Sequence, residues 1–243
     1  MMFKKNKKIS GNDLVVSNNP KSLFSESIKT IRTNLAFSAI DKDVKIVLNT
    51  SPEAGDGKSF VSANLAVAYS QEGKKVLIID CDLRKGRQHE IFKVSNRSDG
   101  GFSNLVLKYN EADGKRGLAK YIKKTDIENV YLIPKGPTPP NPLELLSSEN
   151  TNKILNALRR EYDIIILDCP PVLGLSDTRV MLSYSDINMV VVSNRKTKVE
   201  FLERVKKVFE QANKKITGVI INKTSAKDSN YYGYYCNGYY GEK

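Results

Sequence analysis

Short apolar runs alternate with longer amphipathic segments along most of this chain. Six runs are rich in β-branched residues and apolar at nearly every position; they cover residues 45–50, 75–80, 129–133, 163–168, 187–193 and 216–222. Such runs are typical of parallel strands that are covered on both faces. The segments between them predict helices at about residues 21–39, 58–72, 150–161, 176–184 and 197–212. This alternation predicts an α/β fold in which helices cover both faces of a mostly parallel sheet.

Two stretches interrupt this alternation. Residues 136–142 read Gly-Pro-Thr-Pro-Pro-Asn-Pro, which excludes a helix or a central strand. This stretch predicts a surface loop ahead of a short helix at 142–146. Residues 94–128 are polar apart from an apolar patch at 101–107, and there we expect a small helical excursion.

Residues 225–243 differ from the rest of the chain because they contain few aliphatic residues and many tyrosines. They offer too little apolar surface to form a core element. We therefore expect one folded unit over residues 1–224, which begins with a basic segment at 1–20, and a flexible tail over 225–243. Six of the chain's 12 tyrosines lie in this tail: Tyr231, Tyr232, Tyr234, Tyr235, Tyr239 and Tyr240.

Composition and charge are those of an ordinary globular protein with a basic surface. The chain has 243 residues, of which 40% are apolar and 27% are charged, and no apolar run approaches the ~18 residues of a membrane-spanning helix. Its 39 basic and 27 acidic residues give a net charge of +12, which attracts polyanions but equally fits a solvated surface. The cysteines Cys81, Cys169 and Cys236 form no CxxC pair, so we expect reduced thiols in a cytoplasmic protein.

A candidate phosphate-binding loop follows the first predicted strand. Residues 51–59 read Ser-Pro-Glu-Ala-Gly-Asp-Gly-Lys-Ser, and a helical pattern starts directly after them. This is the order of a P-loop, in which backbone N–H groups surround phosphates, the lysine reaches the β- and γ-phosphates and the serine hydroxyl binds Mg²⁺. Pro52 stands where the strict pattern has glycine. We expect ATP to contact Gly55, Asp56, Gly57, Lys58, Ser59 and Phe60.

Three aspartates lie at the ends of two other predicted strands. Asp80 and Asp82 end the second run, and Asp168 ends the run at 163–168. Each of them alone also fits a strand-end or helix-capping role. Because the carboxyl ends of parallel strands share one edge of a sheet, we expect the carboxylates to meet near Ser59. Such crowding is best tolerated around a cation. The sequence therefore predicts a Mg²⁺ site at Ser59, Asp82 and Asp168, with Asp168 acting directly or through water.

Together these motifs resemble the bacterial tyrosine kinase (BY-kinase) family, in its Gram-positive form, over nearly the whole chain. Residues 55–59 resemble the family's Walker A motif, residues 80–84 (Asp-Cys-Asp-Leu-Arg) its Walker A′ motif, and residues 164–171 its Walker B motif. The tyrosine-rich tail resembles the family's autophosphorylated cluster. The chain departs from the family at Cys169, where threonine is common, and at Gly86, where proline is common. The resemblance implies a P-loop NTPase fold of the MinD/ParA-like Walker A′ branch.

The resemblance also implies roles for single residues. Asp80 would orient an incoming tyrosine hydroxyl and accept its proton, while Lys58 bears the charge of the γ-phosphate. Arg84 would stabilise the acidic cluster or the phosphates. Asn222 stands at the adenine-contacting position of this fold, and it equally fits a turn residue that ends a strand.

Assembly and partners are implied in the same way. Glu26, Lys29 and Arg32 match the family's Glu-x-x-Arg-x-x-Arg oligomer-interface motif on the helix at 21–39, with lysine in place of the first arginine; they also fit i, i+3 pairs on a helix surface. The resemblance implies a homo-oligomeric ring. A tail attached just after the last strand reaches a neighbouring copy more easily than its own Asp80, so we expect transfer in trans. Each phosphotyrosine adds about −1.5 to −2 of charge to the tail, so we expect heavy phosphorylation to repel it from the aspartates and dissociate the ring. Its partners would be a transmembrane activator with a cytoplasmic tail, protein tyrosine substrates and a cognate phosphotyrosine phosphatase, and not nucleic acid. The kinase would act at the inner face of the plasma membrane. It would regulate the synthesis or export of capsular or extracellular polysaccharide.

Two other functions fit part of the sequence. A ParA/MinD-like partitioning or positioning ATPase shares the fold, but its signature lysine would fall at Glu53, and the tail tyrosines would have no role. A non-catalytic, nucleotide-switched scaffold for an anionic polymer or membrane would use only the net charge. Incubation with labelled ATP distinguishes the three functions: the kinase would yield phosphotyrosine, the partitioning ATPase would yield free phosphate, and the scaffold would yield neither.

Overall fold

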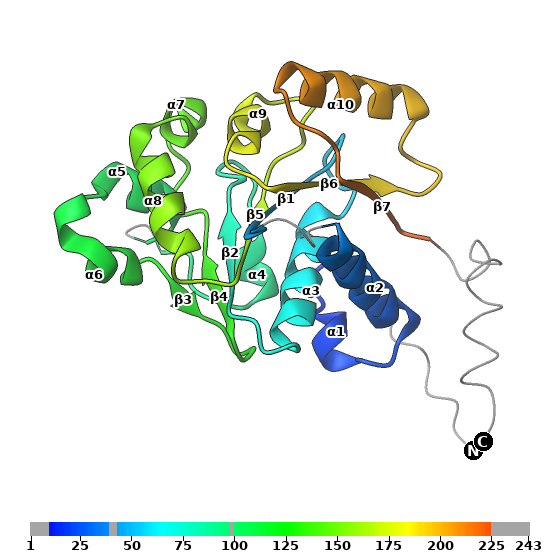
Figure 1. Ribbon diagram of the computed structural model, residues 1–243, viewed down its shortest axis with the longest axis horizontal. Helices are drawn as coiled ribbons and strands as arrows, with labels where there is room; N and C mark the ends of the chain where they lie inside the picture. Colours follow the sequence, from blue (N-terminus) through cyan, green and yellow to red (C-terminus); the bar gives the residue numbers. More distant parts are fainter. Residues whose placement is uncertain (1–9, 39–42, 98–99, 225–243) are drawn as a thin grey trace.

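The computed structural model describes residues 10–38, 43–97 and 100–224. Within these residues seven strands form one sheet in the order β3–β4–β2–β5–β1–β6–β7 (Figure 1). Neighbouring strands are parallel except β3 and β4. The strands are β1 (Ile46–Thr50), β2 (Val76–Asp80), β3 (Lys123–Lys124), β4 (Val130–Ile133), β5 (Ile164–Asp168), β6 (Ile187–Ser193) and β7 (Gly218–Asn222). The predicted α/β fold with a mostly parallel sheet is confirmed.

The six predicted strands are all present, and every position of β1, β2 and β5 is buried, as expected for strands covered on both faces. The last strand begins at Gly218, two residues later than predicted. The antiparallel strand β3 was not predicted, because its two residues are lysines and carry no apolar pattern.

Two groups of helices cover the two faces of the sheet (Figure 1). One face carries α1 (Val15–Asn18), α2 (Leu23–Phe37), α3 (Lys58–Ser70) and α4 (Gln88–Ile91). The other face carries α5 (Phe102–Lys108), α7 (Pro142–Leu146), α8 (Glu149–Arg159), α9 (Asp177–Leu182) and α10 (Val199–Gln211). Successive residues of β2 point to opposite faces, so Ile78 joins the first core and Leu77 and Ile79 join the second.

The predicted helices correspond to α2, α3, α8, α9 and α10, and α7 has the predicted bounds. The polar excursion contains α5, the 3₁₀ helix η1 (Glu111–Asp113) and α6 (Gly114–Ala119). Helices α1 and α4 were not predicted, because four residues are too few to show a helical period. In the described part of the chain, no helix combines the length and the apolarity needed to cross a bilayer.

Helix α3 lies between the sheet and the helices α1 and α2, and its residues from Val61 to Ser70 are all buried. Its buried Asn64 binds the N-terminal segment: the amide oxygen accepts the Val16 N–H at 3.0 Å, and the amide nitrogen donates to the Asp13 carbonyl at 3.1 Å. Residues 13–16 are thereby held on the helix that starts at the candidate phosphate loop.

Candidate active site

The loop between β1 and α3 has the backbone conformation that a P-loop requires. Gly55 and Gly57 have φ values of 88° and 96°, in the left-handed region that favours glycine. Gly57 precedes the first turn of the 13-residue helix α3, whose N-terminal N–H groups are free of helical partners and attract anions. The two glycines are therefore needed for backbone geometry at this anion-binding helix terminus.

The side chain of Asp56 is buried beneath this loop and stabilises it through hydrogen bonds. It is 1% exposed, its Oδ2 accepts the Glu53 N–H at 3.2 Å and its Oδ1 accepts the Thr197 hydroxyl at 3.4 Å. A contact of Asp56 with ATP would therefore come from its backbone N–H group. The predicted ATP contacts of the loop residues stay predictions.

Lys58 begins α3, and its ammonium lies among the predicted aspartates. Its Nζ is 3.1 Å from Asp82 Oδ2 and 3.4 Å from Ser59 Oγ. Burial lowers the pKa of Lys58, but the charges of the three aspartates, led by Asp168, raise it more, so its pKa lies above its ordinary value. The ammonium therefore stays charged and is available to neutralise phosphate oxygens.

Asp80 and Asp168 lie at the same level at the ends of β2 and β5, and both are fully buried. Asp168 accepts hydrogen bonds from Ser62 Oγ at 3.3 Å and from Gln88 Nε2 at 2.8 Å. Asp80 Oδ2 accepts the Gln88 N–H at 3.0 Å, whereas Asp80 Oδ1 has no hydrogen-bond partner among the described residues. Burial and the charge of Asp168 raise the pKa of Asp80 well above its ordinary value, although Gln88 and Lys58 oppose this.

The oxygens at this edge are of the kind that Mg²⁺ prefers. Mg²⁺ usually binds one or two carboxylates together with substrate phosphates and water. Both oxygens of Asp168 accept hydrogen bonds, and both oxygens of Asp82 are engaged by Lys58 and Lys85, so a direct contact of either carboxylate with the ion would replace one of these bonds. In the residues that the structure describes, no group of three or more His, Cys, Asp or Glu could hold a metal ion alone. Nucleotide phosphates would have to complete the site, and with them Ser59, Asp82 and Asp168 fit the ion.

Gln88 is a member of this site that the sequence analysis missed. It is fully buried; its backbone N–H binds Asp80, and its Nε2 donates to both Asp168 Oδ2 and the Ser59 carbonyl, the latter at 3.0 Å. One residue thus joins both buried aspartates to the first turn of α3. Nothing in the sequence marks it, because an isolated glutamine in a short polar segment matches no motif.

Replacing Gln88 with alanine is expected to lower the free energy of unfolding by about 1–3 kcal/mol, because Asp168 loses a buried hydrogen-bond donor. Urea denaturation measures this change. Gln211→Ala, at an exposed position of α10, is the matched control and should stay within about 0.5 kcal/mol of the unmodified protein. Equal stability of both variants would contradict the assigned hydrogen bonds.

The structure pairs Arg84 with a residue that was not predicted. Its Nε lies 3.2 Å from Oδ2 of Asp177, the first residue of α9, and the Asp177 side chain is only 3% exposed. The side chain of Arg84 is 41% exposed and lines the same groove as the phosphate loop. A role of Arg84 at the acidic cluster or the phosphates stays a prediction.

A large groove extends from the phosphate loop to α2 and β7, with a volume of about 1940 Å³. Pockets for small ligands usually measure roughly 300–1,000 Å³. The groove therefore has room for a nucleotide and a segment of polypeptide together. Asn222 lines it too, but its Nδ2 donates to the Asp56 carbonyl at 2.9 Å, so this amide is engaged by the phosphate loop, and a contact with adenine stays a prediction.

The predicted interface residues on α2 make contacts within the chain. Glu26 and Lys29 form an i, i+3 ion pair at 2.8 Å. Arg32 is turned towards the end of α3, where it binds Glu72 at 2.5 Å and the Ala68 carbonyl at 2.8 Å, and its side chain is only 14% exposed. Their role in oligomers stays a prediction. The six predicted acceptor tyrosines lie outside the described residues.

Cys81 and Cys169 follow the two buried aspartates and are themselves buried thiols. Burial and the neighbouring Cys169 raise the pKa of Cys81 well above its ordinary value. The raised pKa keeps Cys81 as a neutral thiol. The expectation of reduced cysteines stays a prediction, and Cys236 lies outside the described residues.

Comparisons with known proteins agree with this geometry. A family model described as an AAA domain matches residues 44–220. The putative tyrosine-protein kinase CapB of Staphylococcus aureus is 39% identical over 235 residues, which cover 96% of this chain and 99% of CapB. Tyrosine-protein kinase YwqD of Bacillus subtilis is 35% identical over 92% of this chain and 91% of YwqD. Among solved structures, the chimerical protein CapA2B2 superposes with a TM-score of 0.79 at 35% identity, over 90% of this chain and 92% of that chain.

Proposed function

This chain belongs to the bacterial tyrosine-protein kinases, and from this membership we propose that it transfers the γ-phosphate of ATP to tyrosines of its own residues 225–243. The observation that carries the proposal is the position of the Lys58 ammonium at the start of α3, where it contacts the Asp82 carboxylate and feels the charges of Asp80 and Asp168. The proposed acceptors are Tyr231, Tyr232, Tyr234, Tyr235, Tyr239 and Tyr240.

In this reaction the phenolic oxygen forms a bond to the γ-phosphorus while the bond from that phosphorus to the ADP oxygen breaks. The loop N–H groups and Lys58 hold the phosphates and balance their charge. Asp80 orients the phenol and takes its proton. An ordinary aspartate, with a pKa near 4, is a weak base for a phenol with a pKa near 10, and the raised pKa of Asp80 reduces this gap.

Mg²⁺, when bound, supplies charge neutralisation at the β- and γ-phosphates. Ser59 Oγ and the Asp82 carboxylate would hold it, and Asp168 would act on it directly or through water. In the structure, Asp82 Oδ2 binds Lys58 and Asp82 Oδ1 accepts the Lys85 N–H at 2.9 Å, so this carboxylate is already oriented towards the phosphate loop.

Access to Asp80 requires movement of the turn that follows it. Asp80 is fully buried, and Gly86 lies so close that a Cβ added there would stand 2.2 Å from Asp80 Oδ1. The turn is closed by the Gly86 N–H, which donates to the Asp82 carbonyl at 2.7 Å. We therefore expect the acceptor tyrosine to enter after this turn has opened.

The wider setting is part of the same proposal. The tail follows β7 in the sequence and is delivered more easily to a neighbouring copy than to its own Asp80, so transfer occurs in trans within a ring to which α2 contributes. A transmembrane activator with a cytoplasmic tail recruits the kinase to the inner face of the plasma membrane. A phosphotyrosine phosphatase resets the ring after phosphorylation has dissociated it. The process controlled is capsular or extracellular polysaccharide synthesis or export.

Truncation after Ala226 is expected to remove self-phosphorylation but leave nucleotide binding and the phosphorylation of an added Glu-Tyr copolymer. The physical reason is that the truncation removes the acceptors and none of the described contacts around Lys58. Phosphotyrosine mass spectrometry measures the result.

A full-length variant with phenylalanine at the six tail tyrosines is the matched control, because it keeps the tail but removes its hydroxyls. It should behave as the truncated chain does. Strong phosphotyrosine on either protein would show that the main acceptor lies elsewhere.

A further inference from the structure

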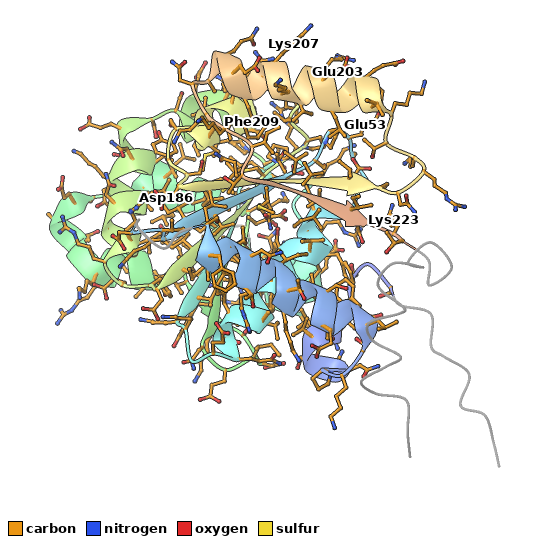
Figure 2. All side chains as sticks on the ribbon, turned by 45° about the vertical axis from the view of Figure 1, so that its right-hand side comes forward. Glu53, Asp186, Glu203, Lys207, Phe209 and Lys223 are labelled. Carbon is orange, nitrogen blue, oxygen red and sulfur yellow. The ribbon has the colours of Figure 1, made fainter. Side chains whose placement is uncertain are left out.

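Two consecutive residues at the end of β7 bind two consecutive carbonyls of the phosphate loop. Asn222 Nδ2 donates to the Asp56 carbonyl at 2.9 Å, and Lys223 Nζ donates to the Gly55 carbonyl at 2.5 Å. Figure 2 shows Lys223 at the end of this strand. These contacts join segments that are 166 and 168 residues apart in the sequence.

Asn222 is fixed in this position from several sides. Its Oδ1 accepts the Lys223 N–H at 2.8 Å, and its own carbonyl accepts the Asn194 N–H at 2.8 Å. A Cβ added to Gly57 would stand 2.0 Å from Asn222 Nδ2, so the amide occupies the space that the missing side chain of Gly57 leaves open. The close approach depends on glycine at this position.

Lys223 reaches the loop from an unfavourable backbone conformation. Its φ is 59°, in the left-handed region where glycine and asparagine are favoured over other residues. A lysine at this position is strained relative to glycine, and its side chain ends on a loop carbonyl in a charge-assisted hydrogen bond. The contact therefore offers a reason for lysine where the backbone alone would favour glycine.

The two carbonyls determine where the loop N–H groups point. In a trans peptide unit the C=O of one residue and the N–H of the next point in opposite directions. Holding the Gly55 carbonyl thus turns the Asp56 N–H away from Lys223, and holding the Asp56 carbonyl turns the Gly57 N–H away from Asn222. Both N–H groups belong to the set that binds phosphates in a P-loop.

We propose that Asn222 and Lys223 form a clasp that pre-organises the phosphate loop, and that Lys223 is a positioning residue for the polyphosphate of the nucleotide. The proposal rests on the nucleotide site of the proposed kinase and adds to that site two residues from the end of the edge strand β7. Since the clasp acts on loop N–H groups, it sets the affinity for phosphates and not the recognition of the base. A positioning effect of this kind raises the KM for ATP and leaves kcat at saturating ATP nearly unchanged.

The test compares Lys223→Gly, Lys223→Met and Lys223→Arg in the full chain. Calorimetry measures the affinities for ATP and for inorganic tripolyphosphate, both with Mg²⁺, because tripolyphosphate has no base. We expect Lys223→Gly and Lys223→Met to weaken both ligands by the same factor, about 5- to 10-fold, with a matching rise in the KM for ATP and kcat within about twofold. Lys223→Arg keeps a donor and should restore most of the affinity. Lys206→Met, on exposed α10, should change neither affinity.

The glycine variant separates the clasp from backbone strain. Lys223→Gly and Lys223→Met lose the same contact but only glycine relieves the strain at φ 59°, so Lys223→Gly should unfold at a higher temperature than Lys223→Met while both lose affinity. An unchanged affinity of Lys223→Gly for tripolyphosphate overturns the proposal. A loss of affinity for ATP alone also overturns it, because it would place Lys223 at the base of the nucleotide. If the unmodified protein bound neither ATP nor tripolyphosphate, the nucleotide site itself would be wrong and the clasp with it.

Discussion

Replacing Lys58 with methionine is expected to lower tyrosine phosphorylation by about 10²–10³-fold or more. The ammonium is the cation that the structure places beside Asp82 and Ser59, and its charge is sustained by three carboxylates. Methionine fills a similar volume without any charge, so the transferring phosphate would lose its protein cation. Quantitative phosphotyrosine mass spectrometry after incubation with Mg²⁺-ATP measures the loss.

A loss of folding must be separated from a loss of chemistry, because removing Lys58 leaves buried carboxylates without their counter-charge. Lys58→Arg keeps a cation but changes its shape, so its stability should exceed that of Lys58→Met while its activity is still strongly reduced. Circular dichroism and urea denaturation report the fold, and Lys153→Met on α8 is the surface control. Wild-type phosphotyrosine on Lys58→Met would make the assignment of the active site wrong.

Replacing Asp82 and Asp80 separately with asparagine is expected to give two different losses. Asp82→Asn should weaken Mg²⁺-ATP binding about tenfold or more, since Asp82 binds Lys58 and is the proposed direct ligand of the ion. Asp80→Asn should keep that affinity within about threefold and lower phosphotransfer about 10²–10⁴-fold, because an amide cannot take the phenolic proton. Nucleotide titration and phosphotransfer assays on both variants distinguish the roles.

Asp163→Asn is the matched control. Asp163 precedes the opposite end of β5, where its Oδ2 accepts the Lys75 N–H at 2.8 Å, far along the strand from Asp168. Its replacement should change neither nucleotide affinity nor phosphotransfer. Equal losses of ATP affinity in Asp80→Asn and Asp82→Asn would mean that the two roles are shared or exchanged.

From the sequence alone one can predict six of the seven strands, the phosphate loop and the meeting of Asp80, Asp82 and Asp168. The strands are predictable because burial on both faces leaves a continuous apolar run, as in residues 164–168. The meeting of the aspartates is predictable because parallel strands bring their carboxyl ends to one edge whatever the order of the strands. The conformation of the loop is predictable because Gly55 and Gly57 sit where left-handed φ values are needed.

The side chains that complete the active site from other parts of the chain became visible only in the folded structure. Gln88 reaches Asp168, Asp177 holds Arg84, and Lys223 binds the phosphate loop from the end of β7. None of these residues has a local pattern, since its partner is brought close by the strand order and not by sequence spacing. The same holds for Arg32, whose spacing on α2 suggested an exposed interface but whose partner Glu72 lies in the turn after α3. Periodicity reveals which face of an element is buried, whereas a long polar side chain finds its partner only when the elements have packed together.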